Sequence, residues 1–405
     1  MKKAIALFSA AAILLCTFMV AGEKNSTEYI PLAYEGNSYE LIESLENDMD
    51  FAAGAAGKAA KSASDGSIAS SLGYVVVTEY IPADGKTDVS DSLQALIDEN
   101  PNRTIYFPDG VYLIGKPILT PADPKKSVDL QLSNYAVIQA TDDFEGEALI
   151  RLGGKDAAND THTVGSNYSL TGGVINPCGK ANGVSIDSGR ETAVRNVSIK
   201  NAVIGIHIKY GANNSSSDAD ISDVNIIGTG STDSIGLLVE GYDNTFTNMR
   251  IGNVFTGVYL KSSSNSLRNI HPLYYSDYTD YENSCGFLDE GGNNIYDFCY
   301  SDQFCNGFRT VGNASSIFDN CFCFWYSGSG GKEVAFKADG KFNSVVSNLR
   351  SNFREDTRNA VLEVGKPGGN GVFDNLLTDS GRVADKSYKR YTQGTLLWLI
   401  KCLFV

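Results

Sequence analysis

Histidines and paired cysteines are scarce in this chain of 405 residues. It has three histidines, and none of its eight cysteines lies in a Cys-x-x-Cys pair. Structural zinc sites are built mostly from such pairs and from histidines. The composition therefore argues against a metal site, and we expect neither a metal nor an organic cofactor.

Basic residues are in the minority. The 33 lysines and arginines stand against 48 aspartates and glutamates, which gives a net charge of −15. A nucleic-acid partner would need a basic face to neutralise its phosphates. We therefore exclude nucleic acid as a partner, and an anionic glycan would need a local basic patch.

Long apolar runs are confined to the two ends of the chain. Met1, Lys2 and Lys3 precede an apolar run over residues 4–21 that contains no acid, and Gly22 follows it. A basic start, a short apolar stretch and small residues at its end are typical of a secretory signal peptide. We expect a signal peptide over residues 1–22, with a membrane anchor as the alternative. Its removal would leave a secreted or cell-surface protein without a stable membrane span.

The last eleven residues, 395–405, are apolar except for Thr395 and Lys401. This run is too short to span a bilayer. We expect a final strand, a cap or a contact in an oligomer, and a homo-oligomer stays open.

The cysteines outside the apolar start are widely spread. Seven remain after residue 22, and an odd number with such spacing does not form a small disulfide framework. We expect buried thiols rather than disulfides. They are Cys178, Cys285, Cys299, Cys305, Cys321, Cys323 and Cys402.

One short phrase occurs eight times between residues 194 and 376: an apolar residue, any residue, Asn or Asp, then another apolar or small residue. Its spacing varies too much for a rigid short repeat and suits one turn of a wide solenoid. An Asn amide can bond to its copy one rung away, and Asn tolerates a left-handed bend between two strands. The eight positions are Asn196, Asp223, Asn248, Asn269, Asp297, Asn320, Asn348 and Asn375.

A different pattern precedes these repeats. Asp88 or Ser90 can cap a short helix with Leu93, Leu96 and Ile97 on its apolar face, and Pro101 ends it. Residues 105–108 and 111–114 then predict a pair of strands joined by a turn at residues 109–110. A helix here would cover the open end of a β stack.

The sequence Asp-Gly-Lys-Thr-Asp at 84–88, the helix, and Tyr-Phe-Pro-Asp-Gly-Val-Tyr-Leu-Ile at 106–114 resemble, in that order, the entrance of the pectate lyase-like superfamily. The resemblance implies an all-β fold, a right-handed single-stranded parallel β-helix with a short N-terminal capping helix. It does not select one family, because polygalacturonases, pectic lyases, glycan epimerases and tailspike hydrolases share this start. The sets of residues typical of polygalacturonases and of calcium-dependent pectate lyases are missing here.

The resulting division of the chain has five parts. Residues 23–72 are rich in Ala, Gly, Ser and Glu and predict a flexible leader. After it we expect an N-terminal cap over 73–125, β-helix rungs over 126–385, and a C-terminal cap or tail over 386–405.

Stacking the strands that begin with glycine aligns two outward columns. The first alternates in charge and the second is mixed. A surface charge ladder explains the alternation. Alternatively, Glu240 and Glu290, two rungs or about 9.6 Å apart, form a carboxylate pair near the inverting glycosidase spacing. The columns are Asp187, Lys209, Glu240, Lys261 and Glu290, and Ser185, His207, Leu238, Tyr259, Leu288 and Arg309.

Aromatic residues gather in the loops after three successive rungs. The insertion at residues 271–282 holds four tyrosines and three acids, and Tyr-Ser recurs at 275–276, 300–301 and 326–327. Aromatic rings suit the apolar faces of sugars, and Asp277 and Asp302 would lie about one rung apart, or about 4.8 Å. Two converging carboxyl groups could act as acid and base.

These patterns predict a secreted glycoside hydrolase acting on a polysaccharide or oligosaccharide. Asp277 and Asp302 are the expected catalytic pair, with Glu290 in reserve and Arg309 as a further catalytic candidate. A uronate lyase or epimerase using Tyr259 and Arg309 and a non-catalytic adhesive glycan-binding β-helix are the alternatives. The expected sugar contacts are Tyr259, His271, Tyr275, Tyr278, Trp325 and Tyr326.

Overall fold

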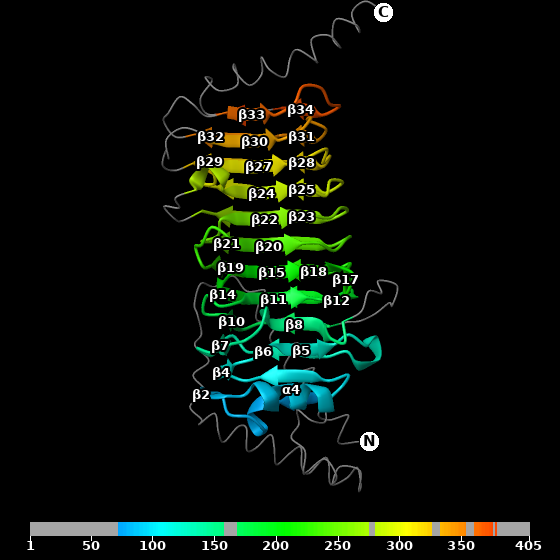
Figure 1. The fold of residues 1–405 in the computed structure, drawn as a ribbon, viewed down its shortest axis with the longest axis vertical. Helices are drawn as coiled ribbons and strands as arrows, with labels where there is room; N and C mark the ends of the chain where they lie inside the picture. The colour runs from blue at the N-terminus through cyan, green and yellow to red at the C-terminus, as the bar shows by residue number, and fades with distance from the viewer. Residues whose placement is uncertain are drawn as a thin grey trace, which may run out of the picture. The chain divides into compact units, whose positions relative to one another are not determined.

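The computed structural model describes residues 72–157, 168–274, 280–325, 333–353, 360–375 and 377–378. From residue 73 on, short strands follow one another as coils stacked along one axis (Figure 1). The chain forms a solenoid, as its repeats predicted, and it is the right-handed parallel β-helix that the family resemblance implied. In the part of the chain that is described, no helix is long and apolar enough to cross a bilayer. The expected signal peptide and most of the expected leader lie outside the described residues.

The ten-stranded sheet forms one face of the stack, and all its neighbouring strands are parallel. Its strands are β5 (Ile118–Pro121), β8 (Ala148–Lys155), β11 (Asn182–Ile186), β15 (Ile204–Ile208), β20 (Ile235–Val239), β22 (Thr256–Leu260), β24 (Cys285–Asp289), β27 (Asn306–Thr310), β30 (Val334–Ala338) and β33 (Ala360–Val364).

A second sheet of 22 strands makes up the other two faces as two parallel ladders. The first ladder contains β1 (Tyr74–Val76), β3 (Thr104–Phe107), β6 (Asp129–Leu132), β9 (Ser169–Thr171), β13 (Ala193–Arg195), β18 (Asp220–Ser222), β25 (Ile295–Asp297), β28 (Ile317–Asp319), β31 (Val345–Ser347) and β34 (Val372–Asp374). The second ladder contains β2 (Asp84–Asp88), β4 (Gly110–Ile114), β7 (Ala136–Ala140), β10 (Val174–Asn176), β14 (Ser198–Ala202), β19 (Asn225–Gly228), β26 (Tyr300–Asp302), β29 (Phe322–Trp325), β32 (Arg350–Phe353) and β35 (Leu377–Thr378). Strands β21 (Thr245–Gly252) and β23 (Ser266–Leu273) continue through both ladders.

Smaller elements decorate this frame. A three-stranded sheet stands beside it, and three short 3-10 helices lie in turns of the described part of the chain. They are β12 (Ser188–Arg190), β16 (Tyr210–Gly211) and β17 (Asn214–Ser217), and η1 (Val77–Glu79), η2 (Pro124–Lys126) and η3 (Tyr281–Asn283).

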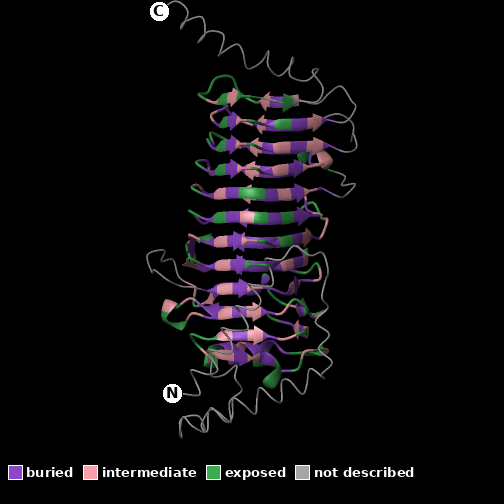
Figure 2. Cartoon of the chain, turned by 180° about the vertical axis from the view of Figure 1, so that it is seen from behind, coloured by how far each residue is buried: buried purple, intermediate pink, exposed green. Residues whose placement is uncertain are grey.

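The core runs inside the coils, because side chains alternate between the two faces of each strand. In β15, Ile206 and Ile208 are fully buried, while His207 between them points outward. Figure 2 shows the same buried bands repeated from rung to rung. In the later rungs rings stack on rings, as between Phe287 and Phe308, whose centroids are 4.7 Å apart.

The predicted helix is confirmed, but its expected cap is wrong: the N-cap residue is Val89, which makes no side-chain capping hydrogen bond, so neither Asp88 nor Ser90 occupies that position. Helix α4 (Ser90–Glu99) buries Leu93, Leu96 and Ile97 at the N-terminal end of the stack (Figure 1). The Asp88 carboxylate accepts a hydrogen bond from the Ser90 N–H at 2.9 Å. Asp88 precedes the N-cap residue, and its bond satisfies the N–H of the first helical residue.

The strands on either side of residues 109–110 exist, but they do not pair with each other. Strand β3 pairs with β1 and β6, whereas β4 pairs with β2 and β7. The expected strand pair is wrong, because the Asp109-Gly110 turn makes a corner between two faces of the coil.

The repeated Asn or Asp occupies the bend between the first and second ladders. Seven of the eight predicted positions have φ between 52° and 57°, the left-handed region that Asn and Asp tolerate. Asn248 donates to Asp223 at 3.2 Å, and Asn269 donates to Asn248 at 2.8 Å. Neighbouring rungs therefore bond through these side chains, as the repeat predicted.

The eighth position, Asp297, was assigned incorrectly. The bend residue of that rung is Phe298, with φ 54°. The repeat was misread because Ile295 looks like an inward apolar residue, although its side chain is 47% exposed on the surface.

A second amide ladder, which the sequence reading missed, lies inside the stack. The backbone N–H of Asn244 donates to Asn265 Oδ1 at 3.1 Å, and the N–H of Asn265 donates to Asn294 Oδ1 at 2.9 Å. In the next rung, Ser316 takes the place of the asparagine. Its hydroxyl accepts a hydrogen bond from the Asn294 N–H and donates one to the buried Asp289 carboxylate at 2.6 Å. These polar groups are almost fully buried, so their mutual hydrogen bonds keep the turn from leaving unsatisfied donors.

Glycine recurs near the start of the sheet strands because the rungs approach closely there. A Cβ on Gly236 would lie 2.5 Å from the Gly257 carbonyl oxygen, and one on Gly257 would lie 2.4 Å from that of Gly286. No side chain fits at these distances. The glycines that suggested a strand start in the sequence therefore reflect contact between rungs.

The expectation of free thiols holds for the six described cysteines. Cys285, Cys299, Cys305, Cys321 and Cys323 are buried, and Cys178 is half-buried. Cys402 lies outside the described residues.

Replacing Asn265 with alanine should lower the free energy of unfolding by about 3 kcal/mol, because buried backbone and amide donors of Asn244 lose their acceptor. Urea unfolding monitored by circular dichroism measures the change. Asn225→Ala, at an exposed strand position, is the control and should change stability little. Equal effects of the two substitutions would contradict the proposed role of the buried ladder.

Replacing Phe298 with asparagine should raise the free energy of unfolding by about 1 kcal/mol, because a left-handed backbone is costly for most residues and tolerated by Asn. The same urea experiment tests it, with Phe298→Leu as the control that keeps the strain. A lower stability for Phe298→Asn would show that the exposed ring makes a stabilising contact that outweighs the backbone cost.

Candidate functional site

The outward side of the ten-stranded sheet carries a continuous set of polar side chains, here called the charged row. The predicted register is confirmed: Ser185 pairs with His207, and the column continues through Tyr259 to Arg309. It also extends to Arg151 at one end and Glu363 at the other. The charged row consists of Glu147, Arg151, Asp187, His207, Lys209, Glu240, Tyr259, Lys261, Glu290, Arg309, Lys337, Asp339 and Glu363.

The charges of the row form ion pairs. Lys261 lies 3.0 Å from Glu240, and Arg309 lies 2.7 Å from Asp339. The remaining pairs join Arg151 with Asp187, Lys209 with Glu147, and Lys337 with Glu363. Within the predicted alternating column, only Glu240 and Lys261 pair with each other, because Asp187 and Lys209 pair with Arg151 and Glu147 outside it. The expected surface charge ladder is therefore found only in part, and it is not fully solvated: the Asp187 side chain is fully buried, and that of Lys209 is only 10% exposed.

His207 lies between two carboxylates. Its Nε2 is 3.1 Å from Glu240 Oε2, its Nδ1 is 3.7 Å from Glu147 Oε1, and its side chain is 11% exposed. Burial lowers the pKa of His207, and this effect outweighs the two carboxylates, which raise it. A neutral imidazole that donates from Nε2 to Glu240 retains a lone pair on Nδ1. The ring can therefore accept a proton at neutral pH.

Glu240 stays ionised in this setting. Burial raises the pKa of Glu240, but the hydrogen bonds from Lys261 and His207 outweigh burial and hold the pKa below its ordinary value. A carboxylate fixed by two donors is suited to accepting a proton or to orienting its neighbour.

Tyr259 and Glu290 form the next polar pair along the row. Burial raises the pKa of Tyr259, and its hydrogen bond to Glu290 raises it further, so the hydroxyl stays protonated. Lys261 lies over the Tyr259 ring, with Nζ 5.4 Å from the centroid. Glu290 is exposed, and its hydrogen-bond partner is a neutral hydroxyl rather than a cation.

A second polar cluster lies on the second ladder. The rings of His271 and Tyr300 stack at 4.0 Å, and the Tyr300 hydroxyl donates to Asp302 Oδ2 at 3.2 Å. His271 Nε2 lies 3.5 Å from the same oxygen, and the Asp302 side chain is 14% exposed. The structure thus brings together His271 and Asp302, two predicted site residues. Asp277, the expected partner of Asp302, lies outside the described residues.

The aromatic rings near this cluster cover one another. Tyr300 packs on Phe322 with centroids 4.7 Å apart, and the Arg350 guanidinium lies 5.4 Å from the centre of the Phe322 ring. A sugar packs against an open ring face, but the faces of these stacked rings are covered and mainly their edges are free. They are therefore poorly placed to bind a sugar.

Trp325 was assigned incorrectly as a sugar contact. It is 2% exposed, it stacks on Phe353 with centroids 4.5 Å apart, and its Nε1–H donates to the Phe304 carbonyl at 2.7 Å. Its position in β29 faces inward, so it belongs to the core. The other predicted platforms, Tyr275, Tyr278 and Tyr326, lie outside the described residues.

Besides Arg151, Lys337, Asp339 and Glu363, the predicted columns lacked the one further member of the charged row that contacts His207, which is Glu147. It precedes β8, a strand without the leading glycine that marked the other strands, so no column included it. The sequence does show an acidic residue just before an apolar strand. It does not show that this residue lies 3.7 Å from His207, because the two are far apart in the chain.

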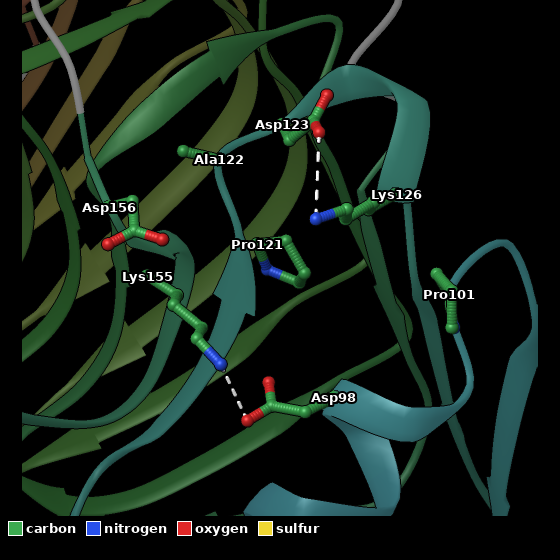
Figure 3. A pocket seen from close by; sticks show the side chains of 8 residues that line it. All are labelled: Asp98, Pro101, Pro121, Ala122, Asp123, Lys126, Lys155 and Asp156. Carbon is green, nitrogen blue, oxygen red and sulfur yellow. Dashed lines mark ion pairs between the residues drawn. The ribbon is translucent and has the colours of Figure 1, made fainter.

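A cavity of about 290 Å³ lies elsewhere, beside α4 and η2 (Figure 3). Lys155 and Asp98 pair across it at 2.6 Å, and Lys126 and Asp123 lie 4.0 Å apart. None of its lining residues belongs to the charged row. The lining comprises Asp98, Pro101, Pro121, Ala122, Asp123, Lys126, Lys155 and Asp156.

Comparison with known proteins identifies the family. The sequence model of the family "Rhamnogalacturonase A/epimerase, pectate lyase-like" matches residues 75–283, which is more than half of the chain. No protein in a search of curated proteins matches.

Several solved structures are similar over most of this chain. An alginate lyase from a Paenibacillus species is 14% identical, with a TM-score of 0.47, and the match covers 71% of this chain and 97% of that one. The A-module of a mannuronan C-5 epimerase from Azotobacter vinelandii is 13% identical, with a TM-score of 0.46, covering 75% and 99%. ORF18 of Geobacillus virus E2 is 14% identical, with a TM-score of 0.48, covering 76% of this chain and 60% of the viral one, so the present chain spans less than two thirds of that protein. Similarity this distant does not extend to the reaction.

His207 should titrate below its ordinary pKa of 6.5, because burial disfavours the imidazolium. The unfolded chain then binds the proton more readily, so the stability contributed by this group is complete above pH 6.5 and falls as the pH drops below it. Nuclear magnetic resonance titration of the imidazole protons measures the pKa, and His207→Gln assigns the resonance. A pKa above 6.5 would mean that Glu147 and Glu240 dominate over burial.

Proposed function

Because this chain belongs to the rhamnogalacturonase A/epimerase, pectate lyase-like family, we propose that it is a polysaccharide-acting enzyme, a glycoside hydrolase whose site is the charged row. The observation that carries this proposal is the placement of His207 between Glu147 and Glu240 on the outer face of the sheet. Charged groups held in such a position cost desolvation energy that an apolar patch of the same shape would avoid. Their catalytic use would explain why they are there. We also propose, from the apolar N-terminus, that the protein is exported.

The charge balance of the row favours a neutral or sparsely charged glycan. Five cations of the row each face a carboxylate, as the ion pairs above describe. A polyuronate would need cations free to meet its own carboxylates. Among the described residues of the row, no cation lacks such a partner, so hydrolysis of a neutral sugar fits better than elimination from a uronate.

Within the row, Glu240 is suited to be the general base. Lys261 and His207 keep it ionised and fix its direction. In an inverting mechanism it would take a proton from the water that attacks the anomeric carbon. His207 acts as a positioning residue for Glu240.

Glu290 is suited to be the proton donor to the leaving oxygen. It lies two rungs from Glu240, or about 9.6 Å by strand spacing, close to the upper end of the range for inverting pairs. Its side chain is exposed, the Tyr259 hydroxyl is its hydrogen-bond partner, and Arg309 interacts with it electrostatically. This assignment keeps Glu290 in the catalytic role that the sequence predicted.

A lyase or epimerase is the second candidate, favoured by the neutral His207 and the protonated Tyr259. Such an enzyme needs a base for the sugar C5 proton and an acid on the other side. The two residues lie two rungs apart, about 9.6 Å, which is long for one sugar ring. Formation of a product that absorbs ultraviolet light would identify elimination.

Glu240→Gln should reduce kcat by roughly 100-fold or more, because it removes the base while preserving shape. The assay measures the reducing ends released from a panel of plant, algal and host polysaccharides, and ultraviolet absorbance is measured in parallel. Asp220→Asn, in β18 on the first ladder, outside the charged row and paired with Arg195, is the control and should retain activity.

Two outcomes would overturn this assignment. If Asp302→Asn abolished turnover while Glu240→Gln did not, catalysis would lie in the cluster on the second ladder. If the protein bound a glycan but released no product from any of them, it would be a glycan-binding β-helix and not an enzyme.

A further inference from the structure

The outward face of the first ladder changes character along the stack. One column reads Asp220, Thr245 and Ser266, and then Ile295 in the next rung. From there the in-register positions are all β-branched and apolar over four rungs. We call Ile295, Ile317, Val345 and Val372 the apolar stripe; they are 47%, 45%, 39% and 49% exposed.

The neighbouring outward column is acidic. It contains Asp297, Asp319, Ser347 and Asp374, in register with the stripe. Hydrogen bonds from Ser347 and Asn348 lower the pKa of Asp319. The face is therefore an apolar column beside a negatively charged one. A partner for it should be apolar along one line and basic along the next.

The end of the chain has this chemistry. Residues 395–405 are apolar except for Thr395 and Lys401, and residues 379–394 contain four basic side chains and two acidic ones. In a chain with a net charge of −15, this segment is locally basic. It complements both columns of the face.

The chain also reaches the face easily. The described residues end with β35, which belongs to the same last rung as Val372. The four rungs of the apolar stripe span about 14 Å. The residues between β35 and position 395 can extend over about 50 Å.

We propose that the C-terminal segment, residues 395–405, docks on the apolar stripe, with the basic residues before it beside the acidic column. Covering the apolar stripe removes apolar surface from water. This proposal concerns a different face from the charged row and does not depend on the proposed function.

Cross-linking through the native Cys402 tests the proposal. Ile317→Cys is introduced into the full chain with Cys16 and Cys178 replaced by serine; the other described cysteines are buried. A short bismaleimide should join the new thiol to Cys402 within one chain, as located by peptide mass mapping. Thr245→Cys, exposed in the polar part of the same column, is the control and should not cross-link.

The other results overturn the proposal. A link between two chains would assign the stripe to a second copy of the protein. Absence of a link, or equal linking from position 245, would mean that the segment does not occupy the stripe.

An independent measurement uses no new cysteine. Ile317→Lys should expose the segment and speed tryptic cleavage after Lys386, Lys389 or Arg390 by roughly 10-fold or more, through the opening equilibrium. Thr245→Lys is the matched control. Equal cleavage rates in the two variants and the parent would contradict docking on the stripe.

Discussion

The structure depends on in-register parallel hydrogen bonding between successive rungs. Each strand bonds to the strand one coil before and one coil after, so equivalent residues meet at about 4.8 Å along the whole stack. The side chain at a given position of one rung is therefore placed next to the side chains at the equivalent positions of the neighbouring rungs. Uncompensated like charges or an unpaired buried amide would be repeated at every rung, and bulky side chains would collide.

The regular features of the sequence follow from this in-register stacking. Glycine stands where the Gly257 and Gly286 carbonyls approach the rung before them. Asn244, Asn265 and Asn294 bond in series where the turn is buried. Charges pair across rungs on the outside, as Glu240 does with Lys261. The same stacking that stabilises the fold therefore builds the charged row, and a catalytic site there would use groups that the ladder already holds in place.

Most of the fold could be predicted from the sequence, but only part of the candidate site could. The bend residues, the capping helix and the register of the outward columns were predictable, because each depends on local backbone preference or on a repeat. The errors arose where surface and core residues look alike. Ile295 is apolar but exposed, and Trp325 is aromatic but buried, since the side to which a residue points depends on the rung alignment.

By itself the sequence determined that this is a stacked β-helix with a capped N-terminal end, because repeats and left-handed Asn bends are written in residue order. Only the tertiary structure decided which polar groups meet. His207 contacts Glu147 and Glu240, which belong to other rungs, one earlier and one later in the chain. It also decided the protonation states, with a lower pKa for His207 and for Glu240. Those depend on burial and on neighbours from other rungs, and no local pattern in one rung encodes them.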